Sequence, residues 1–290
     1  MSLLRARAPD SDFQAVFNEI EELETSNTAS DPTLAATDAY VTTICSIGAK
    51  SLSHVLSIIE RCKGRLTTIG QSSPASRYQI ISSVVAYWQD VQIGSALNIV
   101  DKLLNYTILT PSSVVQWALD AQRLDGGRAL SESWVYEMAE RTINKVVGRV
   151  GQIVAARMHD DLPADQITML DAALSEEVQR MRGLFAEIDD ALAGIAEGAG
   201  EGMLEDADTT ADGKEGEDAK NDLEFAKGWG VRWRRVWQRK LTVQETVLRE
   251  AAKVFPGPVK EEEEVKMELD GVNGGGEVAA VEANDADEIV

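Results

Sequence analysis

The sequence predicts an all-α fold of stacked antiparallel helix pairs, and three observations lead to this prediction. Apolar residues recur every three or four positions through most of the chain. No turn dipeptide lies between two alternating apolar runs, so strand signals are nearly absent. A capping residue followed by proline marks three helix starts, at Pro32, Pro74 and Pro111. Since each predicted helix has only one apolar face, each needs a neighbour, which indicates a stack of helix pairs.

The spacing of apolar residues places the first helices in order along the chain. The predicted helical segments are residues 13–23, 31–48, 52–69, 74–88, 97–104 and 110–119. The connections between them are short, as antiparallel helix pairs require. Neither of the two helices within residues 40–62 can bury its apolar face alone, so these segments are expected to pack on one another.

A long helical hairpin is predicted after this stack, over residues 131–182. Its first arm runs from Ser131 to about His159, and residues 160–163 break it at Pro163. The second helix continues the apolar pattern as far as Ile195, with alternating steps of three and four residues. This alternation is typical of a narrow coiled-coil seam. We therefore assign residues 1–195 to one helical repeat domain that includes the hairpin.

Two acidic segments interrupt and end the helical pattern. Residues 196–227 and 256–290 are rich in Asp, Glu and Gly and contain few large apolar residues. Such segments bury too little apolar surface to offset the loss of backbone entropy, so we predict a disordered loop and a disordered tail. Residues 228–255 between them are predicted to form the closing helix of the same domain.

The composition excludes several function classes. The 290-residue chain carries a formal net charge of −21, which opposes autonomous binding to DNA or RNA. It contains only two histidines, His54 and His159, which we expect to be surface or packed side chains, and two cysteines, Cys45 and Cys62, which we expect to be buried thiols. We therefore predict no catalytic, cofactor-binding or metal-ligating residue, and no enzyme activity. No apolar run approaches a membrane span, so we expect a soluble protein of the cytoplasm or nucleus.

One basic and aromatic segment, from Trp229 to Lys240, has two interpretations. Arginines interleaved with tryptophans can neutralise phosphates and stack on bases, which would indicate contact with RNA. However, Trp229, Trp233 and Trp237 recur every four residues, on one face of a helix, and this spacing is more typical of core packing. On that interpretation Arg232, Arg235, Arg239 and Lys240 point outward. No partner-binding residue can be assigned from the sequence, because an apolar stripe that packs in the core and one that binds a partner have the same pattern.

Several short motifs together resemble one protein family. They are the turn Lys50-Ser-Leu-Ser-His54, the helix ending Val84-Val-Ala-Tyr-Trp88, the run Ile99-Val-Asp-Lys-Leu-Leu104 and the motif Val114-Val-Gln-Trp117. In this order, with a long helical hairpin and a closing helix after them, they resemble the C-terminal helical domain of the large subunit of the nuclear cap-binding complex, in a fungal form. The resemblance covers about residues 10–255.

The resemblance implies a fold, a role and a partner. The fold is a HEAT/ARM-like stack of the type found in the middle domain of a translation-initiation scaffold. The role is that of a non-enzymatic nuclear scaffold in RNA processing and export, which braces a small RNA-recognition-motif subunit; capped RNA binds through that subunit. It also implies that this chain corresponds to the last of three helical domains, and no cap-binding residue can be assigned to it. The alternative is a generic HEAT-type adaptor unrelated to RNA.

Overall fold

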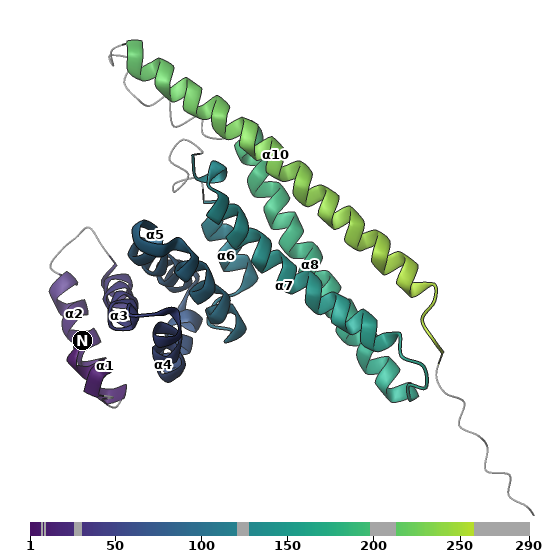
Figure 1. Ribbon diagram of the computed structural model, residues 1–290, viewed down its shortest axis with the longest axis horizontal. Coiled ribbons are helices and arrows are strands. Elements are labelled where there is room, and N and C mark those ends of the chain that lie inside the picture. Colours follow the sequence, from purple (N-terminus) through teal and green to yellow (C-terminus); the bar gives the residue numbers. More distant parts are fainter. Residues whose placement is uncertain (7, 9, 26–30, 121–127, 198–212, 258–290) are drawn as a thin grey trace, which may run out of the picture.

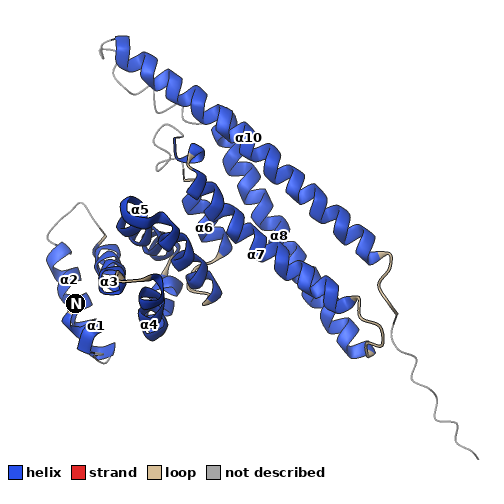
Figure 2. Ribbon diagram, viewed as in Figure 1, coloured by secondary structure: helices blue, strands red, loops and turns tan. Residues whose placement is uncertain are grey.

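The computed structural model describes residues 1–6, 8, 10–25, 31–120, 128–197 and 213–257. These residues form helices joined by short connections, and no strand occurs among them (Figure 2). The predicted all-α, HEAT-like class is therefore confirmed. The helices divide into an N-terminal stack, α1 to α6, and a long hairpin, α7 and α8, along which α10 lies (Figure 1).

The first helices begin where the sequence supplies capping groups. Helix α3 (Pro32–Gly48) starts after Asp31, whose carboxylate accepts the backbone N–H of Thr33 at 2.9 Å. Helix α4 (Leu52–Ser72) starts after Ser51, which accepts from the backbone of His54. These bonds satisfy backbone donors that have no partner within the helix. Two further helices precede them, α1 (Ser2–Ala6), which was not predicted, and α2 (Asp10–Thr25).

Helix α5 (Pro74–Asn105) joins two predicted helices in one bent element. Ser73 caps its start, and Gln92 interrupts the helix with a backbone φ of −160° and ψ of 82°. The bend at Gln92 lets both halves turn apolar faces toward the same interior. The short helix α6 (Pro111–Ala118) follows, with a reciprocal capping box between Thr110 and Ser113.

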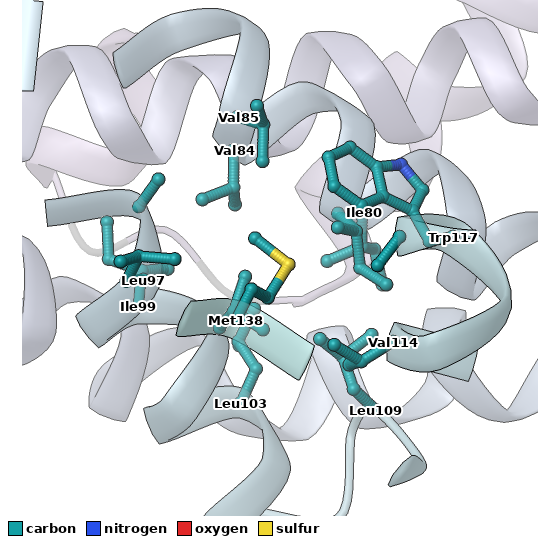
Figure 3. Close-up of a cluster of buried hydrophobic side chains, with 14 of the residues drawn as sticks. Ile80, Val84, Val85, Leu97, Ile99, Leu103, Leu109, Val114, Trp117 and Met138 are labelled. Carbon is teal, nitrogen blue, oxygen red and sulfur yellow. The ribbon is translucent and has the colours of Figure 1, made fainter. Parts of the chain in front are cut away.

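The core lies where α5, α6 and the start of α7 meet (Figure 3). Trp117 of α6 is fully buried there and donates its indole N–H to the Ser82 hydroxyl at 2.8 Å. Ile80, Leu103 and Met138 belong to the same core cluster and are at most 2% exposed. Burial of these large side chains provides the main stabilisation of the stack.

The hairpin consists of α7 (Ser133–Arg157) and α8 (Ala164–Glu197), preceded by a short 3₁₀ turn (Arg128–Ser131). The second arm runs without interruption to Glu197, close to the predicted helix end at Ile195 and beyond the bound of residue 182 given to the hairpin. Its apolar seam explains the extra length, because Phe185, Ile188 and Leu192 are buried in the same row as Met181.

Helix α10 (Gly213–Ala252) begins earlier than predicted. The proposed disordered loop, residues 196–227, is wrong for residues 196–197 and 213–227, which are helical. Residues 198–212 lie outside the described part. Glutamate, alanine and lysine are strong helix formers, and extending an existing helix needs no new nucleus. The composition was acidic, but its helix propensity was high. The predicted tail is described only as far as Gly257, and residues 258–290 lie outside the described part.

Candidate interaction surfaces

The tryptophan face of α10 packs against the bundle. Trp233 and Trp237 are 3% and 2% exposed. Both contact the Tyr136 ring of α7, Trp233 edge-on at 5.2 Å between centroids and Trp237 nearly parallel at 5.3 Å. Trp229, one turn earlier, is half-buried. The core-packing interpretation is therefore confirmed for Trp233 and Trp237, and neither ring is available to stack on a base.

Ion pairs fix α10 along α8. The Arg234 guanidinium donates two hydrogen bonds to Asp189, both 2.9 Å, and the Gln238 amide adds a third at 2.8 Å. Two turns further along, Arg182 of α8 donates to both carboxylate oxygens of Glu245 at 2.7 and 2.8 Å. The hydrogen bond from Arg234 lowers the pKa of Asp189 below its usual value, against partial burial that raises it.

A third anchor lies near the tip of the hairpin. Arg157 of α7 is 6% exposed, which is rare for an arginine. It forms an ion pair with Asp171 of α8 at 2.9 Å and donates to the carbonyl oxygen of Pro256 at 2.8 Å. Its guanidinium also lies 5.0 Å from the centre of the Phe255 ring. One side chain thus holds both hairpin arms and the residues after α10 together. No motif in the sequence indicated this role.

Of the other basic side chains in the segment from Trp229 to Lys240, one packs against the bundle and three are exposed to solvent. Lys240 is half-buried and reaches Asn144 and Glu140 of α7. Arg232, Arg235 and Arg239 are exposed, as predicted, and Arg232 lies over the Trp229 ring at 5.1 Å. This leaves a row of guanidinium groups on the outer side of α10.

A groove of about 590 Å³ opens between the N-terminal helices and α4. Its lining residues include Leu4, Phe13, Tyr40, Arg61, Cys62 and Arg65. Arg65 is already engaged, because its guanidinium lies 4.9 Å from the centre of the Phe17 ring. The groove combines apolar walls with positive charge. It could not be predicted from the sequence, because its walls come from helices far apart in the chain.

The histidines and cysteines do not come together as a reactive site. His54, in the first turn of α4, and His159, just after α7, are both exposed. Cys45 is buried, and burial raises the pKa of its thiol to about 11. Cys62 is half-buried, and burial raises its pKa as well. Both thiols are therefore protonated at neutral pH and poorly nucleophilic. Within the described ranges, no group of three or more His, Cys, Asp or Glu residues could hold a metal ion.

None of the helices in the described part of the chain is long and apolar enough to cross a membrane.

Comparison with known proteins gives one consistent result. The chain is similar to nuclear cap-binding protein subunit 1 of Schizosaccharomyces pombe, with 24% identity over 167 residues, which covers 58% of this chain and 20% of the relative. It is 27% identical over 138 residues to the Anopheles gambiae protein of the same name, which covers 45% of this chain and 16% of that protein. The Arabidopsis thaliana protein of that name is 23% identical over 114 residues, 39% of this chain and 13% of the relative.

The chain thus spans about a fifth or less of the length of these curated relatives. Residues 1–246 match a family described as MIF4G like, which covers the helical stack, the hairpin and most of α10. The resemblance found in the short sequence motifs is confirmed. The chain belongs to the MIF4G-like family.

Proposed function

We propose that this protein is a non-enzymatic scaffold of a nuclear cap-binding complex, which braces a small RNA-recognition-motif subunit for binding to capped RNA and for RNA processing and export. The observation that carries this proposal is the similarity to nuclear cap-binding protein subunit 1 from fungal, plant and insect sources. The proposal includes a nuclear location for this chain.

The physical properties of the chain support a role in holding a partner. A net charge of −21 disfavours direct binding to RNA phosphates, so contact with capped RNA is expected to occur through another subunit. The helices of the stack and hairpin are joined into one continuous apolar core, from α1 to α10. Such a rigid and extended helical surface can hold a partner with little reorganisation on binding.

Co-elution tests the proposal against the generic-adaptor alternative. The purified chain is mixed with the small RNA-recognition subunit of a nuclear cap-binding complex, and the mixture is passed through a size-exclusion column. A shared earlier peak supports the scaffold assignment. An unrelated RNA-recognition-motif protein of similar size serves as control, and equal co-elution of both, or of neither, favours a generic adaptor.

A further inference from the structure

Helix α10 has a second apolar face, which is exposed to solvent, in addition to the buried tryptophan face. Phe225, Val236, Val243 and Val247 are 44%, 43%, 52% and 52% exposed. Their separations are whole or nearly whole helical turns. At about 100° per residue, their side chains lie within about 40° of one another around the helix axis. They form a straight stripe, which we call the valine stripe, along the outer side of α10.

The valine stripe is distinct from the face that holds α10 in place. The packed face consists of residues that belong to the core or contact it, namely Trp233, Trp237, Leu241 and Leu248. The side chains of the valine stripe are exposed to solvent. One apolar face is enough to dock a helix on a bundle. A second row of apolar side chains at helical spacing is typical of a helix that receives a helical partner.

Basic side chains flank this stripe on one side. Arg232, Arg235 and Arg239 are exposed and occupy positions next to the stripe on the side away from Lys240, which faces α7. Neither Arg235 nor Arg239 has a hydrogen bond or ion pair with any residue that the structure describes. Residues 228–252 carry six arginines or lysines and two glutamates, in a chain whose net charge is −21. The valine stripe therefore lies beside a local concentration of positive charge.

We propose that this face of α10 binds an acidic amphipathic helix of a protein partner. Apolar residues of that helix, spaced three or four positions apart, would cover the valine stripe, and its carboxylates would pair with Arg235 and Arg239. Charge complementarity of this kind fixes orientation and raises the association rate. A second copy of this chain is disfavoured, because its own arginine row would face the first.

RNA fits this surface less well than an acidic helix. Arginines alone can bind phosphates, but the three valines offer no ring for base stacking. The one ring of the stripe, Phe225, already packs edge-on against Trp229 at 6.3 Å between centroids. The tryptophans that could stack, Trp233 and Trp237, are buried. An RNA ligand would also leave the apolar stripe uncovered, and so would not account for it.

The test uses the full chain and a synthetic peptide as probe. The peptide is a fluorescent 21-residue helix with leucine at heptad positions a and d and glutamate along one flank. A scrambled peptide of the same composition is its control. Fluorescence anisotropy is expected to show at least tenfold tighter binding of the patterned peptide than of the scrambled one. Equal binding of both would mean charge attraction alone and would overturn the proposal.

Variants locate the binding face. Val243→Asp combined with Val247→Asp should weaken peptide binding at least tenfold, whereas Val91→Asp, at an exposed valine of α5, should leave it unchanged. Arg239→Glu should weaken binding more than Lys50→Glu does at an exposed site of the stack. These positions are exposed, so circular dichroism melting should show every variant folded.

Two further probes separate the other possible occupants. A single-stranded RNA that binds with dependence on Arg239 but not on the two valines would assign the face to RNA and overturn the proposal. A peptide of this chain's own residues 259–273 that binds more tightly than the designed helix would assign the face to the chain's own acidic segment, which also contradicts a separate protein partner.

Discussion

Trp233 shows how a segment that resembles an RNA-binding surface can be structural. Its indole is 3% exposed and meets Tyr136 and Trp237 edge-on, so three rings from two helices share one contact region. Offset and edge-on ring pairs add to the stabilisation that burial alone provides. The four-residue spacing in the sequence favoured this packing over contact with RNA, because a helix places such residues on one face.

Truncation of Trp233 tests the packing directly. We expect Trp233→Ala to lower the free energy of unfolding by about 3–5 kcal/mol, because it leaves a large cavity between α7 and α10. Val236→Ala, at a neighbouring position that is 43% exposed, should have little effect. Urea denaturation followed by circular dichroism measures both. Equal stability of Trp233→Ala and the parent would show that the ring is not part of the core.

Two glycines of α4 allow a matched comparison of single substitutions, because one is crowded by a neighbouring segment and the other is not. A Cβ atom at Gly70 would overlap the carbonyl oxygen of Ile108, whereas a Cβ atom at Gly64 would meet nothing within 4 Å. Gly70→Ala should therefore destabilise the stack, by about 1–3 kcal/mol for an overpacked site. Gly64→Ala should stabilise α4 by up to about 1 kcal/mol, since alanine is the better helix former. Thermal melting that ranks the two variants in the opposite order would contradict the close approach of α4 to the α5–α6 turn.

At the scale of elements, α10 is held on α8 by charged groups as well as by apolar packing. Asp189 accepts hydrogen bonds from Arg234 and Gln238, and its pKa is lowered in the folded state, chiefly by Arg234. A carboxyl whose folded pKa lies below its unfolded pKa stabilises the fold above the unfolded value, and this contribution is lost as the pH falls through the folded pKa. The pair is partly exposed, so solvent keeps the contribution modest.

Asp189→Asn should accordingly destabilise the protein at neutral pH, and its difference from the parent should shrink as the pH falls below the usual aspartate range. Asp90→Asn, at an exposed position of α5, should not show this pattern. Melting temperatures measured from pH 7 to acid pH test the prediction. A parent–variant difference that stays constant or grows in acid would exclude the Arg234–Asp189 pair as its source.

At the scale of the whole molecule, the sequence predicted best those helix starts that carry a capping residue. Asp31, Ser73 and Thr110 accept backbone hydrogen bonds, and such caps have a recognisable residue pattern. Helix α8 ends at Glu197, close to the predicted Ile195, but the bend at Gln92 and the start of α10 at Gly213 were not predicted. Each depends on tertiary contacts or on helix extension, which leave only a weak local signal.

Of the candidate surfaces, too, only some could be predicted from the sequence. The exposed arginines of α10 followed from helical periodicity once the tryptophans were assigned to the core. The groove near Arg61 and the buried Arg157 could not be predicted, because their partners come from separate helices and from the segment after α10. Pairings between distant segments are set by the packing of the whole bundle.

Cap-analogue binding most directly tests the proposal that this chain is a scaffold and not itself a cap reader. A fluorescent 7-methylguanosine cap analogue is titrated with the chain alone, with the small RNA-recognition subunit alone and with both together, and an unmethylated analogue is the control. We predict no methyl-dependent binding by the chain alone, because its net charge of −21 opposes the phosphates, and tighter methyl-dependent binding by the pair than by the small subunit. Tight, methyl-dependent binding by the chain alone would contradict the scaffold assignment.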